Sequence, residues 1–426
     1  MNTGSDLSQI DPVVGDVTVW SLIIDYLPVL VLSYVAVLIV TPLFRGLAIA
    51  IDVVDRPDVG RKIHKSATPY LGGLAVFFGI LAGIAASYIL IDGQPPEYRP
   101  LPVSIVGGMV AITFTGLADD VWGWDPRLKI AGQLVAAALL ALNDIGTRVA
   151  AGLLEYLFGV SSLEYMIPLV DVPFNVTEWI GTAIIAIFVL GGCNASNLID
   201  GLDGLLSGTV AIIATGLLAL SLAVAVYLTP VDVMIIASTM PEQMVADEGA
   251  TLAGARIVLC MALLGAVLGF LPYNFNPARI FLGDCGSLLL GYLCVVIILM
   301  LGEQGETHLV LAGLIIFGIP IIDTILAIFR RKIQGISMSE PDAQHLHHVL
   351  KGWLGGVKRA VLAIYGLEFL LAISGVVLGY LVIIGEFRVM VLYLVFIAFY
   401  MLMALVGIRM GLLQKAARSQ SSGEST

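Results

Sequence analysis

Acidic side chains and asparagines recur at the borders of strongly apolar segments in this chain. The stretch 271–291 joins two apolar runs and contains Asp284 within the sequence GDCGS. Glycines let a backbone approach a ligand closely, and a helix N-terminus presents free N–H groups to anions. A carboxylate in this setting predicts a bound metal ion that holds phosphate.

Two further acidic motifs border apolar runs. Asp119 and Asp120 are adjacent, and their repulsion next to a membrane span requires a cation or a proton. Asn197, Asp200 and Asp203 recur at every third residue, so they share one face of a helical turn or line an irregular loop. A calcium-binding loop is excluded because its later acidic residue is missing, and helix capping accounts for only one of the three residues. We therefore interpret both motifs as functional.

Basic side chains and histidines accompany the acidic motifs. Lys65 ends the basic run RKIHK, Lys129 follows the acidic pair, and the histidines are His345, His347 and His348. Three histidines also suit zinc, but the many carboxylates favour magnesium, which prefers oxygen ligands. Lysines and histidines beside such a metal predict phosphate binding, so the whole set describes a site for phosphoryl transfer.

The composition indicates that membrane helices position these residues. The chain has 426 residues, of which 59% are hydrophobic and 12% are charged, with a mean hydropathy of +0.99. The charged fraction is about half that of a soluble domain, and apolar runs long enough to cross a bilayer recur throughout. The four cysteines show neither a disulfide nor a zinc pattern, and the net charge of −11 argues against nucleic-acid binding.

We predict an all-α, polytopic integral membrane protein with about eleven transmembrane helices, because a β-barrel would show alternating strands instead. The expected spans are 23–51, 71–91, 101–117, 128–142, 179–193, 208–228, 252–271, 287–301, 309–329, 360–384 and 389–412. The predicted domains are an extracytoplasmic N-terminal segment 1–22, a single transmembrane catalytic domain 23–412 and a disordered cytoplasmic tail 413–426.

The basic residues predict the orientation of the chain. All but four of the 21 lysines and arginines fall on one side of the expected spans, and such residues favour the cytoplasm. The N-terminus is then outside and the C-terminus inside. Five inner loops contribute the polar clusters, so the predicted site lies on the cytoplasmic face. Its place at the ends of lipid-embedded helices predicts that one substrate is a lipid.

At these motifs the sequence resembles the polyprenyl-phosphate N-acetylhexosamine-1-phosphate transferases, integral membrane enzymes of the glycosyltransferase family 4 type. The resemblance covers most of the chain. Four motifs follow the order of that family: Asp119-Asp120, NLIDGLDG from Asn197, GDCGS around Asp284 and HLHH from His345. The resemblance implies that a sugar-1-phosphate moves from a UDP-sugar to a polyprenyl phosphate with release of UMP. It also implies Mg²⁺ as cofactor, with Mn²⁺ as a possible substitute.

The resemblance also implies a role for each matching residue. The metal ligands are Asp284 and Asn197. The catalytic positions are Asp119, Asp120, Asp200, His347 and His348. The substrate-binding positions are Lys65, Lys129, Asn194, Asp203, Asn274, Phe281 and His345. Of these, Phe281 resembles the aromatic residue that stacks on uracil.

The form of the histidine motif favours one branch of the family. Leu346 interrupts the histidines, which resembles transferases that pass GlcNAc-1-phosphate to undecaprenyl phosphate in O-antigen, lipopolysaccharide or teichoic acid synthesis. The peptidoglycan branch, which transfers phospho-N-acetylmuramoyl-pentapeptide, shows three consecutive histidines and then a glutamate. That branch is the alternative we retain.

An ion-coupled transporter is the alternative of a different class. Transporter sites lie near the bilayer midplane, commonly between inverted repeats, and neither feature is apparent in this sequence. The expected partners are therefore a UDP-N-acetylhexosamine, polyprenyl phosphate and the bilayer of the bacterial plasma membrane, without nucleic acid. A homodimer is one assembly open to such a protein.

Overall fold

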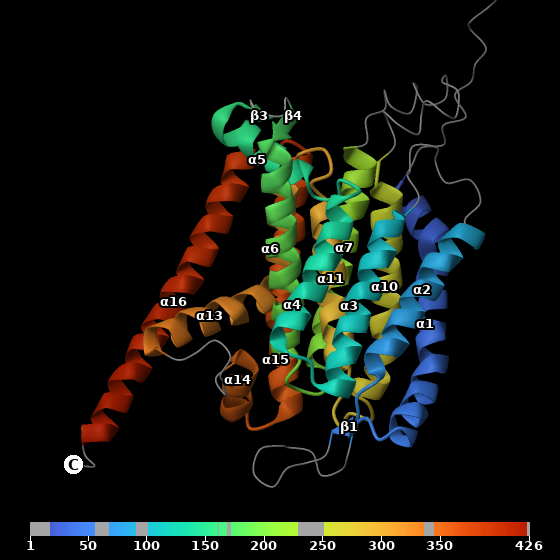
Figure 1. Cartoon of the computed structure of the whole chain (residues 1–426), viewed down its shortest axis with the longest axis vertical. Helices are drawn as coiled ribbons and strands as arrows, with labels where there is room; N and C mark the ends of the chain where they lie inside the picture. Colours follow the sequence, from blue (N-terminus) through green and yellow to red (C-terminus); the bar gives the residue numbers. More distant parts are fainter. Residues whose placement is uncertain are drawn as a thin grey trace, which may run out of the picture.

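Long helices that run side by side form the computed structural model, which describes residues 18–55, 68–90, 101–160, 162–167, 172–228, 251–335 and 345–423 (Figure 1). The helices are α1 Val19–Ala50, α2 Gly72–Leu90, α3 Val103–Trp122, α4 Pro126–Ala141, α5 Arg148–Phe158, α6 Val176–Ile199, α7 Leu205–Tyr227, α10 Ala253–Asn274, α11 Gly283–Met300, α12 Thr307–Ile316, α13 Gly318–Gln334, α14 Leu346–Leu354, α15 Val357–Ile383 and α16 Val389–Gly423. Two short antiparallel hairpins pair β1 Val54–Asp55 with β2 Thr68–Pro69, and β3 Glu164–Ile167 with β4 Val172–Asn175.

The helical, multi-pass fold class predicted from the sequence is confirmed, but the count of eleven spans is not. Within the described ranges, nine helices are long and apolar enough to cross a membrane, or ten if one bent pair is a single span. Helix α4 has only 16 residues, about 24 Å of helix, which is shorter than the ~30 Å hydrocarbon core. The single span expected over 309–329 is in fact two helices, α12 and α13, bent by 80° at a break.

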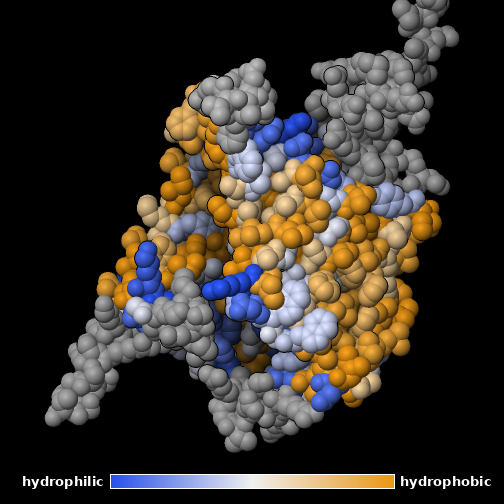
Figure 2. Space-filling model, viewed as in Figure 1, coloured by the Kyte–Doolittle hydropathy of each residue, from blue (hydrophilic) through white to orange (hydrophobic). Residues whose placement is uncertain are grey.

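Helix α11 lies at the centre of the bundle. Of its apolar window 89% is buried, against 6% for α16, which stands at the periphery (Figure 1). Helices α2, α3, α6 and α10 pack against α11. Helix α16 continues to Gly423, so a helix occupies 413–423, where the sequence predicts a disordered tail. Figure 2 shows apolar side chains over the middle of one face, with hydrophilic side chains near its ends and around a hollow in the lower half.

Glycines bring the backbones of α2 and α3 against the first turn of α11. A Cβ atom on Gly73 would lie 2.2 Å from the backbone nitrogen of Gly286. A Cβ atom on Gly116 would lie 2.5 Å from the carbonyl oxygen of Asp284. Such distances are too short for any side chain, so these glycines permit the direct backbone contact that fixes the start of α11.

Candidate active site

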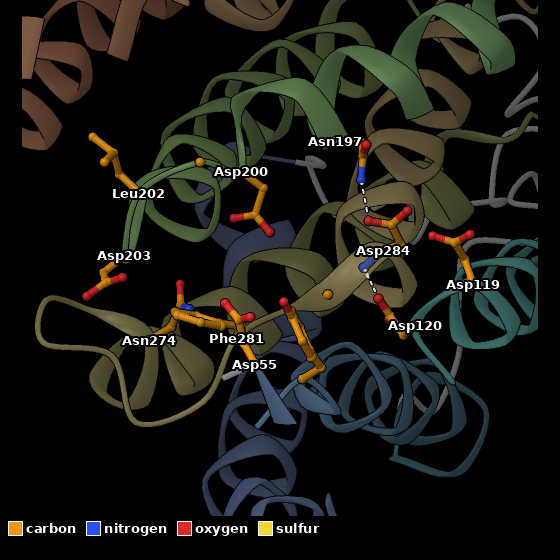
Figure 3. Close-up of a pocket in the computed structure, with 13 residues that line it drawn as sticks. Asp55, Asp119, Asp120, Asn197, Asp200, Leu202, Asp203, Asn274, Phe281 and Asp284 are labelled. Atoms are coloured by element: carbon orange, nitrogen blue, oxygen red, sulfur yellow. Dashed lines mark hydrogen bonds between the residues drawn. The ribbon is translucent and has the colours of Figure 1, made fainter. Parts of the chain in front are cut away.

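A polar cavity of about 500 Å³ opens where α3, α6 and α10 end and α11 begins. Its lining residues are Asp55, Tyr70, Asp119, Asp120, Asn197, Asp200, Gly201, Leu202, Asp203, Asn274, Phe281, Gly283 and Asp284. Figure 3 shows carboxylates from several elements pointing into this common space. The four segments that meet here are far apart in the sequence, so the fold brings together the acidic motifs that the sequence singled out.

Lys129 connects two of these carboxylates. Its ammonium lies 2.7 Å from a carboxylate oxygen of Asp119 and also forms an ion pair with Asp284. Gly123, with a φ of +62°, ends α3, and the Asp125 side chain caps the start of α4. This short turn returns Lys129 beside Asp119, because a left-handed glycine stops one helix and the cap begins the next. One cation therefore offsets the repulsion between two acids from different helices.

Asn197 and Asp284, the predicted metal ligands, are in direct contact. The Asn197 amide donates one hydrogen bond of 2.8 Å to Oδ1 of Asp284 (Figure 3) and another of 2.9 Å to Oγ of Ser287. Asn197 lies in the last turn of α6, whereas Asp284 and Ser287 belong to the first turns of α11. The amide nitrogen makes both bonds, so its oxygen is the atom available to a cation.

Asp120 caps the helix that carries Asp284. Its Oδ1 accepts a 2.8 Å bond from the backbone N–H of Asp284 (Figure 3), and its Oδ2 accepts a 3.0 Å bond from the N–H of Cys285. These N–H groups belong to the first turn of α11, and the N–H groups of a first turn have no acceptor inside their own helix. A negative charge is also favourable at this end of a helix dipole. Asp120 thus holds Asp284 in place, a role that the adjacent-acid pattern did not reveal.

Asp200 and Asp203 lie in the turn between α6 and α7. The carboxylate of Asp203 accepts bonds from the Asn276 side chain at 2.8 Å and from the Ala278 backbone N–H at 3.0 Å. Burial raises the pKa of Asp200 to about 8, and the nearby negative charge of Asp284 adds to this effect. The two acids therefore differ: Asp203 braces the loop before α11, while Asp200 has a strong affinity for a proton or a cation.

Phe281 and Tyr70 form an aromatic wall of the cavity, and the sequence analysis assigned Tyr70 no role. The Phe281 backbone N–H donates to the carbonyl of Pro69 at 2.8 Å, and the Phe281 ring centroid lies 6.0 Å from that of Tyr70. Asn274 lies nearby, where its amide bonds the Ile280 carbonyl and the Ser207 hydroxyl. This end of the cavity has a flat apolar face beside polar groups, which suits a nucleobase.

Tyr70 and Asp55 line the cavity, yet the sequence analysis assigned neither of them a role. Asp55 is on β1, whose pairing with β2 places it opposite Thr68. That pairing joins residues more than ten positions apart and spans only two residues on each strand, so no periodic pattern marks it. The motif TPYLGG that contains Tyr70 was a usable signal, because its paired glycines permit a close approach of another backbone beside Tyr70.

The histidine segment approaches the cavity from outside its lining. His345 is buried, and its Nδ1 lies 2.8 Å from a carboxylate oxygen of Asp323 on α13. His347 packs against Gly201, where an added Cβ would lie 2.3 Å from Nε2 of the imidazole. Burial lowers the pKa of His347 to about 4, so this ring is neutral near pH 7. His348 lies beside it, with ring centroids 4.3 Å apart.

Asn194, a predicted substrate-binding residue, does not line the cavity. Asn194 donates to the Gln133 side chain at 2.9 Å and to the Leu190 carbonyl at 2.7 Å, which are contacts between helices. Lys65 lies outside the described residues. The binding roles of both stay predictions.

The donor set of the cavity fits Mg²⁺. No three His, Cys, Asp or Glu side chains in the described ranges come together as a closed metal cage. Magnesium does not require one, because it commonly binds through one or two carboxylates together with water and substrate phosphates. Asp284 and the Asn197 amide oxygen supply such a partial oxygen set, and Lys129 shows that a positive charge is already favourable at this point.

The helical bundle and its acidic cavity are those of a membrane enzyme, and comparison with known proteins identifies its family. The profile of glycosyl transferase family 4 matches residues 102–302. The chain is 33% identical over 353 residues to a Bacillus subtilis protein named probable undecaprenyl-phosphate N-acetylglucosaminyl 1-phosphate transferase, across 82% of this chain and 83% of that protein. The chain therefore belongs to glycosyl transferase family 4, as the four motifs predicted.

Two other relatives are named for the transfer of different groups. Decaprenyl-phosphate N-acetylglucosaminephosphotransferase of Mycolicibacterium smegmatis is 31% identical over 352 residues, which are 75% of this chain and 74% of the relative. Phospho-N-acetylmuramoyl-pentapeptide-transferase of Bacillus thuringiensis is 32% identical over 333 residues, which are 76% of this chain and 87% of the relative.

Proposed function

We propose that this protein transfers N-acetylglucosamine-1-phosphate from UDP-N-acetylglucosamine to a polyprenyl phosphate and releases UMP. The carrying observation is the convergence of Asp284, Asn197, Asp119 and Lys129 at the ends of membrane helices. A nucleotide-sugar pyrophosphate needs cations around it, and a lipid phosphate needs access from the bilayer. Lys129 supplies one cation, the cavity lies at the ends of membrane helices, and two of the relatives described above are named for transfer to a polyprenyl phosphate.

The reaction is an in-line displacement at the β-phosphorus of the donor. An oxygen of the polyprenyl phosphate attacks that phosphorus, the bond to the bridging oxygen breaks, and UMP leaves with the bridging oxygen. The lipid phosphate is largely ionised near neutral pH, since the second pKa of a phosphate monoester is about 6. Asp119 is already paired with Lys129. Asp119 therefore acts by orienting Lys129, and an obligatory base is not needed.

The remaining residues bind and orient the two substrates. Asp284 and Asn197 would hold Mg²⁺, which when bound neutralises charge on the pyrophosphate. The Lys129 ammonium stabilises charge that develops on the transferred phosphoryl group. Phe281 stacks on the uracil, and Asn274 fixes the loop that presents it through the Ile280 carbonyl.

The cavity lies on the cytoplasmic face of a bacterial plasma membrane, with the N-terminus outside and the C-terminus inside. Support comes from the basic residues that flank the same helix ends. Arg45 lies near the end of α1, where its side chain donates to the Arg279 carbonyl at 3.1 Å. Arg127 lies at the start of α4, beside the acidic pair. Such residues are enriched on the cytoplasmic side of membrane proteins.

The test is a transfer assay with the purified protein in detergent. UMP release is measured with UDP-N-acetylglucosamine, undecaprenyl phosphate and Mg²⁺, and then with each component omitted in turn. We expect release only when all three are present. Asp284→Ala should lower the rate by about 10²–10³-fold or more. Asp25→Ala, which removes an exposed carboxylate of α1, is the control and should retain the activity. A wild-type protein that releases no UMP under these conditions contradicts the proposal.

The same assay separates the two branches of the family. UDP-N-acetylmuramoyl-pentapeptide replaces UDP-N-acetylglucosamine as donor, because one relative is named for transfer of that group. The histidine motif with Leu346 between His345 and His347 favours the smaller donor. Faster transfer from the muramoyl-pentapeptide donor would assign the chain to the peptidoglycan branch instead.

A further inference from the structure

The break between α12 and α13 lies inside the helix bundle. Helix α12 ends at Ile316 and α13 begins at Gly318, with an angle of 80° between them (Figure 1). A continuous helix would bond the Leu314 carbonyl and the Ile319 N–H within its own ladder. A bend of this size removes those bonds, and unsatisfied backbone groups are costly where water is excluded.

Side chains from two neighbouring helices bind the backbone groups at the break. The Ile319 N–H donates a 2.9 Å hydrogen bond to Oε2 of Glu368 on α15. The Tyr400 hydroxyl on α16 donates a 2.8 Å bond to the Leu314 carbonyl. One side chain therefore stabilises the start of α13 and the other stabilises the end of α12.

The burial of Glu368 has a high free-energy cost for a contact that only stabilises the fold. Glu368 lies near the middle of α15, a candidate membrane span, and its side chain is 0% exposed. Its second oxygen, Oε1, is buried without a hydrogen-bond partner among the described residues. Burial of a carboxyl group at such a place is costly, so intramembrane acids usually serve a function.

Helix α13 leads directly from Glu368 to the histidine segment. Asp323, one turn beyond Ile319, is 2% exposed. Its Oδ2 contacts Nδ1 of His345, and its Oδ1 accepts the backbone N–H of Leu346, both at 2.8 Å. The angle at which α13 leaves the break therefore contributes to the position of His345 and of α14, which also packs against α15. His347, on that helix, packs against the glycine beside Asp200.

We propose that Glu368, together with Tyr400, is a positioning residue that sets the angle of α13 and thereby places the histidines at the cavity. Only the expected effect of Glu368 on the rate of transfer rests on the proposed function. The structural part of the proposal, that Glu368 orders the histidine segment through α13, holds independently of the reaction.

The first test compares Glu368→Met with Glu368→Gln. Methionine fills a similar volume without an acceptor, whereas the Gln side chain retains a carbonyl oxygen for the Ile319 N–H. We expect Glu368→Met to lower kcat about tenfold to a hundredfold, since small displacements of catalytic groups have effects of this size. KM for UDP-N-acetylglucosamine should change by about twofold or less, because its base binds elsewhere. Glu368→Gln should recover most of the activity.

The second test is independent of activity. Hydrogen–deuterium exchange of the protein in detergent, without substrate, is followed in the α14 segment Leu346–Leu354. Exchange should increase in Glu368→Met, increase less in Tyr400→Phe and remain near wild type in Glu368→Gln. Helix α2 reports global unfolding, and Glu386→Met, which removes an exposed acid after α15, is the matched control.

The outcomes separate the two proposals. If the wild type releases no UMP but α14 exchanges faster in Glu368→Met, the proposed function fails and the positioning role stands. Unchanged exchange in α14, or a Glu368→Gln variant as impaired as Glu368→Met, overturns the positioning role. If Glu368→Met unfolds throughout, Tyr400→Phe decides, and unchanged α14 exchange in that variant also overturns it.

Discussion

The Asp120 carboxylate holds the helix that carries Asp284, through a 2.8 Å hydrogen bond from the Asp284 backbone N–H to Oδ1. The second carboxylate oxygen accepts the next N–H, of Cys285, at 3.0 Å. Both oxygens are thus used by the backbone of α11. This geometry separates the adjacent acids: Asp119 faces Lys129, and Asp120 anchors the first turn that presents Asp284.

We predict that Asp120→Asn weakens the site by loosening this anchor. Asparagine has a single acceptor oxygen, so one N–H of the first turn loses its partner, at a cost of about 1–3 kcal/mol. The melting temperature in detergent should fall, and the Mg²⁺ concentration that gives half-maximal activity should rise. A variant with wild-type stability and wild-type magnesium dependence would contradict the anchoring role.

Replacement of Lys129 by Met tests its place between Asp119 and Asp284. Loss of the ammonium removes charge stabilisation from the reaction, so kcat should fall by about 10²–10³-fold. The two carboxylates also lose their shared cation, so Mg²⁺ should bind at least as tightly as in the wild type, measured by titration calorimetry. Arg127→Met, an exposed basic residue of the same helix, is the control. Weaker magnesium binding in Lys129→Met would show that the lysine supports the metal instead.

The contact between Gly201 and His347 predicts a sharp steric effect. Gly201→Ala would place a Cβ 2.3 Å from Nε2 of His347, so the imidazole must move away from the cavity. We expect kcat to fall about tenfold or more, because the displacement is of the order of 1 Å. Gly191→Ala is the matched control, since a Cβ on Gly191 meets nothing within 4 Å. Equal activity of the two variants would argue against a role for His347.

Asp200 gives the stability of the metal-free protein a dependence on pH. Its pKa is raised from 3.8 to about 8 in the folded state, so the folded state binds this proton more tightly than the unfolded state between these values. The stability supplied by the protonated group is complete below its unfolded pKa and is lost as the pH rises through about 8. The melting temperature should therefore fall from about pH 5 to about pH 8. Asp200→Asn should flatten this slope, and an unchanged slope would contradict the assignment.

The sequence was sufficient to predict which motifs meet at the site, because the physics of membranes restricts the possibilities. Apolar length gives the helices, and basic residues assign their ends to one side. Asp119, Asn197 and Asp284 are then all placed at helix ends on that side, and the structure confirms their contact through Lys129 and the Asn197 amide.

What the sequence did not predict depends on contacts between distant residues. Asp55 reaches the cavity through a two-residue strand pairing, and Asp323 contacts His345, which lies 22 residues later in the sequence. The break before Gly318 was also missed, because α12 and α13 together have the length and apolar composition of one span. The partners that stabilise the break, Glu368 and Tyr400, come from two later helices, so the sequence does not indicate that they contact it.

The backbone contacts of Gly73 with Gly286 and of Gly116 with Asp284 fix one wall of the active site. No side chain separates α2, α3 and α11 at these points, so no substitution there can enlarge or reshape that wall. A change in the shape of the cavity is therefore expected to come from other lining residues, such as Gly201 and Leu202 in the turn after Asp200.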